Sequence, residues 1–266
     1  MIGWWREWLT AWGPPLLLVG ASLAVWEGLT QGLGVPRWLL PPPTAIAQEL
    51  VRRADLLARH AWITIQEVIF GFGVALCTGI ASAVAIAHWR VAERALYPLV
   101  VVSQTIPIIA IAPLLLIWVG YDLPMKVIVV AIISFFPITV NTVDGLRSVD
   151  PDLVNLLRTM GARRWQVFSK VSLPWALPYL FSGAKVAATV SVIGAVIGEW
   201  VGASAGLGWL MTQAVPRFQT PLVFAILVVL GGMGIALFQA VVWAERLCLP
   251  WHYSMKREEA LKWQSL

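Results

Sequence analysis

Long apolar runs alternate with short polar stretches along most of the chain. Six apolar runs are long enough to be considered as membrane spans, at about 14–34, 62–87, 97–119, 125–143, 175–201 and 222–242. A helix needs about 20 mostly apolar residues to cross the hydrocarbon core of a bilayer. The pattern therefore predicts an all-α polytopic membrane protein with about six transmembrane helices.

The first run is the least uniform, because Glu27 interrupts it and its cleanly apolar part, 16–26, is short. An apolar stretch of that length is also typical of a signal peptide. Arg6 is the only basic residue before it, and no convincing small-residue cleavage site follows. We therefore expect an uncleaved first span.

The polar stretches divide the chain into three parts. We expect an N-terminal span and external amphipathic segment over 1–59, a transmembrane domain over 60–250, and a cytoplasmic tail over 251–266. The stretch 36–60 combines three consecutive prolines with several arginines. It is too polar to span a membrane and is predicted to lie on the surface.

Composition and charge support the membrane assignment. Hydrophobic residues make up 59% of the chain and charged residues 12%, whereas a soluble domain carries about 25% charge. The net charge of +5 does not indicate nucleic-acid binding, because the cations lie mostly in the loops between apolar runs. With the amino terminus in the cytoplasm, roughly twice as many Lys and Arg residues fall inside as outside. The stretch between the fourth and fifth runs is then cytoplasmic.

Few residues suggest metal or catalytic chemistry. Cys77 and Cys248 lie far apart, and the histidines (His60, His88 and His252) are scattered near the ends of runs. We therefore predict no metal site and no cofactor. The sequence has no Gly-x-x-x-x-Gly-Lys-Ser/Thr loop, so the chain is not itself an ATPase.

The segment 155–174, between the fourth and fifth runs, is basic and amphipathic. Asp150 can cap a short helix, and Gly161 can end it by adopting a left-handed conformation. A second helix is predicted over about 162–171. It should end before Pro174, because a proline disfavours helical backbone at the preceding residue.

On this second helix, Trp165 and Phe168 fall three residues apart on one face, beside Arg163, Arg164 and Lys170. Such a helix can lie on anionic lipid with its aromatic rings in the acyl boundary. It can also insert into a groove on a soluble partner. Spacing alone favours the lipid-bound interpretation.

The order of Gly161, Leu173 and Pro174 resembles the coupling-loop signature of binding-protein-dependent ABC transporter permeases. In that signature Glu-Ala-Ala is followed three residues later by Gly, and about a dozen residues after that by Leu-Pro. Here 155–157, Asn-Leu-Leu, occupy the Glu-Ala-Ala positions. The resemblance extends over about 60–250 and implies that the segment docks on an ATPase. The residues it assigns to this docking are Gly161, Ala162, Arg163, Arg164, Trp165, Phe168, Leu173 and Pro174.

Members of this family work in assemblies, and the resemblance implies the same for this chain. Two permease copies pair, here expected as a homodimer, and two separate ATP-binding cassette ATPase subunits dock on them. An extracytoplasmic substrate-binding protein delivers the solute. The resemblance thus implies a multi-pass permease of an ATP-driven importer, surrounded by lipid in the inner membrane of a prokaryote, and not an enzyme.

The outer end of the fifth run carries a second resemblance. The stretches 198–202 and 206–211 read Gly-Glu-Trp-Val-Gly and Gly-Leu-Gly-Trp-Leu-Met. They look like the type I permeases for sulfonates, taurine, nitrate, thiamine precursors or riboflavin. The longer run 192–208 looks closest to permeases for pyrimidine thiamine precursors or riboflavin. A sulfonate, taurine or nitrate is the alternative solute.

Polar groups at the ends of the apolar runs are candidates for the solute pathway. Glu199 lies near the outer end of the fifth run, where an ionisable group is costly unless it is paired or lines an aqueous path. The glycines after it would let the loop fold back between spans as a gate. Pro107 either kinks the third span or opens a pathway beside it. The candidate pathway or gate residues are Gln104, Ser134, Glu199, Gly206, Gly208 and Trp209.

Two alternatives to a permease come from other functional classes. An intramembrane enzyme would need catalytic groups that converge from facing spans, and Ser134, Asp144 and the scattered histidines do not form such a set. A structural membrane subunit would leave the basic segment 155–174 and the glycine-rich loop unexplained. Within the fifth run, Lys185 is expected to extend its ammonium group toward the cytoplasmic face.

Overall fold

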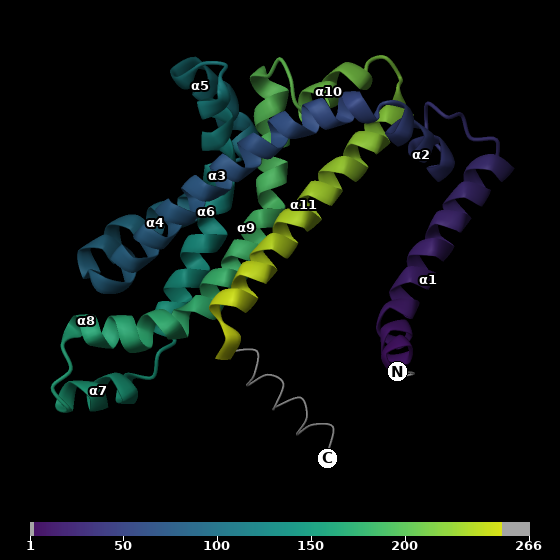
Figure 1. The fold of residues 1–266 in the computed structure, drawn as a ribbon. Coiled ribbons are helices and arrows are strands. Elements are labelled where there is room, and N and C mark those ends of the chain that lie inside the picture. Colours follow the sequence, from purple (N-terminus) through teal and green to yellow (C-terminus); the bar gives the residue numbers. More distant parts are fainter. Residues whose placement is uncertain (1–2, 252–266) are drawn as a thin grey trace. The chain divides into compact units, whose positions relative to one another are not determined.

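The computed structural model describes residues 3–251, and every regular element in that range is a helix (Figure 1). The predicted tail, 251–266, lies outside the described residues except for Trp251. The helices are α1 (Gly3–Gly32), α2 (Pro43–Arg52), α3 (Ala54–His88), α4 (Arg90–Thr105), α5 (Ile108–Val119), α6 (Leu123–Arg147), α7 (Pro151–Thr159), α8 (Arg164–Val167), a π-helical turn (Phe168–Ser172), α9 (Leu173–Gly202), α10 (Leu207–Ala214) and α11 (Thr220–Cys248).

Within residues 3–251, four helices are long and apolar enough to cross a membrane: α3, α6, the continuous helix Arg164–Gly202, and α11. The bent pair α4 and α5 makes a fifth candidate. α1 is helical over most of the first predicted span, 14–34. The prediction of an all-α protein with several apolar spans is confirmed.

The third predicted span, 97–119, is wrong as a single helix. α4 and α5 meet at 105° across Ile106 and Pro107. Pro107 disfavours helical backbone at the residue before it, and Ile106 is extended with φ −89° and ψ 121°. The hydroxyls of Ser103 and Thr105 donate to carbonyl oxygens of the preceding turn, at 2.7 and 2.9 Å. The proline therefore breaks the span, and nearby hydroxyls bond to some of the carbonyls at the end of α4.

The second helix of segment 155–174 is also longer than predicted. It does not end before Pro174, because α8 continues through the π-helical turn into α9. In that turn the N–H of Leu173 bonds to the carbonyl of Phe168, five residues back. Pro174 lies just after this turn, inside the helix that is continuous from Arg164 to Gly202. The wider turn thus joins α8 to the span that follows.

The stretch 36–60 is only partly a surface segment. α2 is a short amphipathic helix that buries Ala45 and Ile46. α3 begins at Ala54, so the residues up to His60 belong to a long helix and not to the polar stretch that was predicted.

The described residues form two compact units. Unit 1 comprises the chain up to His60 together with Leu210–Val229, and unit 2 comprises Ala61–Trp209 together with the chain from Leu230 onward. In unit 1 the ring of Trp26 on α1 lies 5.6 Å from that of Phe224 on α11.

The core of unit 2 lies between α6 and α9. At Gly183 an added Cβ atom would lie 2.4 Å from the carbonyl oxygen of Pro137, so the two backbones approach more closely than a larger residue would allow. Ile138 and Ala187 are fully buried in the same interface. This contact fixes α9, the helix whose two ends carry the candidate sites.

Candidate functional site

Segment 155–174 forms a helix pair, α7 and α8, at one end of unit 2 (Figure 1). The side chain of Asp150 caps α7 by accepting the N–H of Asp152 at 2.8 Å. Gly161 has φ +84°, and its N–H and that of Ala162 close the turn on carbonyls of α7. The predicted cap at Asp150 and the predicted end of the first helix at Gly161 are both confirmed.

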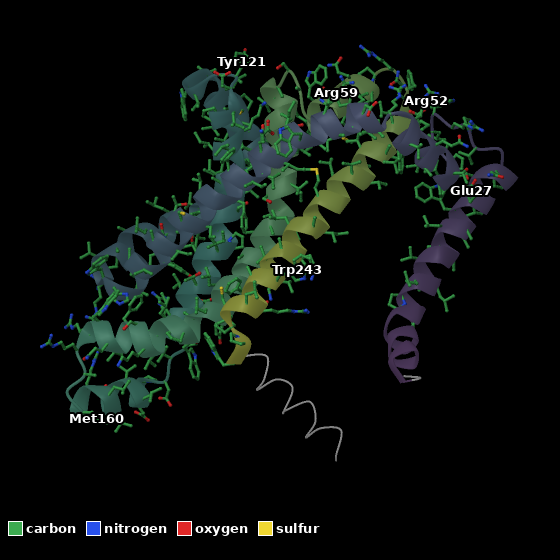
Figure 2. The ribbon with its side chains drawn as sticks, viewed as in Figure 1. Glu27, Arg52, Arg59, Tyr121, Met160 and Trp243 are labelled. Carbon is green, nitrogen blue, oxygen red and sulfur yellow. The ribbon has the colours of Figure 1, made fainter. Side chains whose placement is uncertain are left out.

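Several hydrophobic side chains of this pair face outward, although Val167 on α8 is buried. α7 buries no residue, and Met160, at the tip of the turn, is 74% exposed and points away from the helices (Figure 2). Trp165 is 72% exposed, and its ring lies 5.5 Å from that of Phe168. Phe168 is half-buried and packs edge-on against the ring of His88 at 4.8 Å. Phe168 therefore supports Trp165, which is the exposed member of the predicted aromatic pair.

A hollow of about 510 Å³ lies beside these aromatic rings. Arg90, Arg158 and Arg164 line it together with His88. The described part of the chain offers no carboxylate within 4.0 Å of the three guanidinium groups. The hollow is therefore suited to a negatively charged group from outside the chain.

The second candidate region, segment 199–209, is buried at Glu199 and at 206–208. Glu199 is only 1% exposed, and its carboxylate accepts the hydroxyl of Thr64 at 2.6 Å and the N–H groups of Gly208 and Trp209. Both N–H groups belong to the first turn of α10, where a carboxylate is favoured. The Thr64 oxygen accepts the N–H of Leu207 at 2.9 Å. Glu199 and Thr64 together bond three successive N–H groups at the start of α10.

Gly206 turns the chain into α10. It has φ +116°, and a Cβ atom at this position would lie 2.2 Å from the carboxylate carbon of Glu199. Only glycine combines that backbone conformation with that contact. Gly208 is also packed against Glu199, at 2.9 Å from a Cβ to Oε2. The structure thus brings together four predicted gate residues, namely Glu199, Gly206, Gly208 and Trp209.

An ion pair that the sequence reading missed lies beside Glu199. Lys126 on α6 and Glu67 on α3 approach to 2.9 Å, with side chains 10% and 0% exposed. The carboxyl group of Glu67 neighbours that of Glu199. The available signal was Thr64 and Glu67, two polar residues three apart on one helical face within an otherwise apolar run.

Lys185 has a partner that the sequence did not reveal, and its extension toward the cytoplasmic face stays a prediction. Its ammonium group lies 3.0 Å from the carboxylate of Glu245, which is 4% exposed. Glu245 follows the sixth predicted run, 222–242, but α11 continues to Cys248 and places it in the core. Two charges inside the membrane-spanning part are thus paired with each other.

The two other predicted pathway residues lie elsewhere. Gln104 is exposed near the break between α4 and α5. Ser134 is fully buried, with its hydroxyl 3.5 Å from the carbonyl oxygen of Ala187 on α9. Neither residue is among the hydrogen-bond partners of Glu199 described above, and their pathway role stays a prediction.

Among the described residues no three or more His, Cys, Asp or Glu side chains group as metal ligands would. Cys77 and Cys248 are exposed, free thiols.

A single helix links the two regions. α9 has 30 residues, which corresponds to a length of about 45 Å. It leaves the π-helical turn beside α8 and ends in the glycine-rich turn before α10 (Figure 1). An outward-facing helix pair and a loop with a buried carboxylate thus lie at the two ends of one helix.

Residues 75–247 match the family described as "Binding-protein-dependent transport system inner membrane component". The chain belongs to this family. As an ABC transporter permease it is a multi-pass protein of the prokaryotic inner membrane, and the resemblance drawn from segment 155–174 is confirmed.

Curated relatives cover most of the permease. A probable ABC transporter permease of Haemophilus influenzae is 38% identical over 86% of this chain and 94% of its own. The formylaminopyrimidine transport permease ThiX of Halalkalibacterium halodurans is 37% identical, over 89% and 95% respectively. The riboflavin transport permease RibX of Chloroflexus aurantiacus is 36% identical, over 93% and 92%.

A solved structure supports the fold. The inward-facing methionine ABC transporter MetNI, in its selenomethionine soak crystal form, has a chain that matches with a TM-score of 0.61 and 25% identity. The match covers 74% of the permease and 97% of that chain.

Proposed function

We propose that this permease imports formylaminopyrimidine or riboflavin, delivered by an extracytoplasmic binding protein and driven by separate ATPase subunits. The names of two relatives at 36–37% identity support this choice of solute. The run 192–208, which looks closest to permeases for such compounds, lies in the buried segment that closes on Glu199. Residues 60–250 form the transporting domain in this proposal.

The observation that carries the proposal is the outward-facing pair α7–α8. α7 buries nothing, Trp165 is 72% exposed, and the adjoining arginine-lined hollow has no carboxylate of the described chain within 4.0 Å. An exposed aromatic anchor beside unpaired guanidinium groups is typical of a protein interface whose partner is missing. The ATPase would cover Trp165 and place an acidic side chain in the hollow.

Each ATPase of a pair needs a docking site, and the chain offers one segment of this kind. A closed two-fold homodimer would present two equivalent copies of segment 155–174. In the same assembly segment 199–209 would act as the outer gate, with α9 connecting each docking site to its gate.

The docking part is tested by co-purifying the permease with its ATPase after replacing Trp165 and Phe168 by alanine. Loss of the aromatic anchor should reduce ATPase association at least tenfold and uncouple ATP hydrolysis from uptake. Trp118→Ala is the matched control, since Trp118 is 71% exposed but lies on α5. Normal ATPase binding and normal transport by the double variant would show that α7–α8 does not dock.

The solute is tested with proteoliposomes that hold the permease, its ATPase and its binding protein. ATP-dependent uptake of labelled formylaminopyrimidine or riboflavin is the expected result. Uptake of a sulfonate, taurine or nitrate, with neither ring compound transported, would overturn the solute assignment and leave the docking result standing.

A further inference from the structure

The start of α10 is held by side chains from two other helices. The N–H groups of Leu207, Gly208 and Trp209 would otherwise be unpaired, since the first N–H groups of a helix have no partner within it. Thr64 accepts one of them and Glu199 the other two. The hydroxyl of Thr64 in turn donates to Glu199 at 2.6 Å. α3 and α9 thus share the task of holding α10.

Two buried carboxyl groups and one ammonium group lie around this contact. Glu199 and Glu67 are both almost completely buried, and Lys126 is the cation next to them. Lys126 passes the backbone of Gly198, where its side-chain carbons lie 3.5 Å from the position of an added Cβ. Its ammonium group nevertheless pairs with Glu67 at 2.9 Å. Glu199 therefore remains available to the N–H groups of α10.

We infer that Thr64 is a positioning residue that holds the carboxylate of Glu199 against the start of α10 and so keeps the turn 203–206 closed, and that Glu67 protects this contact by binding Lys126. Thr64 supplies a hydroxyl that bridges Glu199 and α10. Glu67 binds Lys126 and prevents the ammonium group from competing for Glu199. The contact is independent of solute identity, but its importance for transport rests on the proposed role of segment 199–209 as the outer gate.

The test measures how fast a cysteine in the turn reacts with a membrane-impermeant thiol reagent. Ser204 is the position of choice because it is exposed, whereas a cysteine at Gly206 would collide with Glu199. The background carries Cys77→Ala and Cys248→Ala. Thr64→Val keeps the side-chain shape but removes the hydroxyl, and should raise the labelling rate about tenfold. Thr64→Ser restores the hydroxyl and should label at the original rate.

Thr78→Val is the matched control on the same helix. Its hydroxyl donates to the carbonyl oxygens of Val74 and Ala75 on its own helix, at 2.8 and 3.4 Å, so its loss should leave labelling unchanged. Equal labelling of the Thr64→Val, Thr64→Ser and starting proteins would overturn the inference.

A second pair of variants keeps the inference testable if Thr64→Val does not fold. Glu67→Gln removes the partner of Lys126, so the ammonium group should turn to Glu199 and labelling should rise. Adding Lys126→Met removes the competitor, and the double variant should return to the starting rate. A double variant that labels as fast as Glu67→Gln alone would show that Lys126 does not compete for Glu199, and would overturn that role.

Transport by the same variants separates this inference from the proposed function. Faster labelling together with ATP hydrolysis that no longer drives uptake supports both. Faster labelling with unchanged transport supports the positioning role and shows that segment 199–209 is not the gate.

Discussion

The regions at the two ends of α9 differ in how far their functional side chains are exposed. At segment 155–174 the aromatic and cationic side chains face outward, and Trp165 is 72% exposed. At segment 199–209 the polar groups are enclosed, and Glu199 is 1% exposed with three hydrogen-bond donors around it. The first region lacks partners that another protein can supply, whereas the second is already complete within this chain.

Under the proposed function, segment 155–174 receives the signal from the ATPase and segment 199–209 responds to it. The helix Arg164–Gly202 runs without interruption from one to the other, through a π-helical turn. A π-helical turn places one extra residue in a helix and is frequent at functional sites. Tilting α8 against a partner would therefore act on the whole of α9, and the contact most exposed to that movement is the one between Glu199 and α10.

A second glutamate provides an internal reference for Glu199. Glu27, near the end of α1, accepts the N–H and the hydroxyl of Thr44 at the start of α2, at 3.0 and 2.7 Å. Both glutamates thus cap the helix that follows their own. The contact of Glu27 (labelled in Figure 2) is exposed, whereas the side chain of Glu199 is buried. The same contact should be far more costly to lose where water cannot replace it.

The largest expected effect comes from Glu199→Ala. Three buried donors lose their acceptor, at about 1–3 kcal/mol each, and relief of the repulsion with Glu67 offsets part of this. We expect a net loss of about 3 kcal/mol and a fall of roughly 6–12 °C in the thermal unfolding midpoint in detergent. Glu27→Ala is the matched control and should shift the midpoint far less. Equal shifts would mean that burial does not determine how much such a cap stabilises the protein.

Two of the glycines with positive φ, Gly161 and Gly206, extend the comparison. Gly206→Ala adds a Cβ atom 2.2 Å from Glu199, whereas Gly161→Ala meets no atom within 4 Å. Backbone strain costs about 1–2 kcal/mol at either site, and overpacking adds about 1–3 kcal/mol at Gly206 alone. The thermal unfolding midpoint of Gly206→Ala should be clearly lower than that of Gly161→Ala. The opposite order would contradict the packing of segment 199–209.

Asp150 tests the folding of the docking pair. Asp150→Ala removes the side-chain acceptor at the start of α7 and should cost about 1 kcal/mol. Because α7 buries no residue, the loss should appear locally, as roughly fivefold faster hydrogen exchange of the α7 amides. Asp122→Ala is the control, since Asp122 precedes α6 without a side-chain capping bond. If Asp122→Ala accelerated hydrogen exchange in α6 equally, the effect of Asp150→Ala could not be attributed to its capping hydrogen bond.

The smallest effect is expected at the ion pair of Glu93 and Arg147, which lie 2.7 Å apart with side chains about half exposed. Glu93→Gln should change the free energy of unfolding by less than about 1 kcal/mol, because an exposed pair gains little over hydrated charges. The difference should vanish in about 1 M salt, where the Debye length is near 3 Å. A large loss of unfolding free energy that does not depend on salt would show that this pair behaves as a buried ion pair, like Glu67–Lys126.

Local chemistry made several features predictable. Apolar runs of span length predicted the all-α membrane fold. In lipid the backbone hydrogen bonds of such a run can be satisfied only in a helix or a closed barrel. Asp150 and Gly161 marked the ends of α7 because capping and left-handed turns depend on the residues themselves. The glycines after Glu199 indicated a tight loop for the same reason.

The sequence by itself determined the helices, the turn glycines and the order of parts that marks the permease family. Only the tertiary structure decided which charges meet. Glu67 with Lys126 and Lys185 with Glu245 are separated by about 60 residues of sequence, and no periodicity pairs residues across different helices. The 105° break at Pro107 and the uninterrupted passage through Pro174 show the same limit. Both prolines carry the same local restriction, and the hydrogen bonds available around each one decided whether the helix broke or continued.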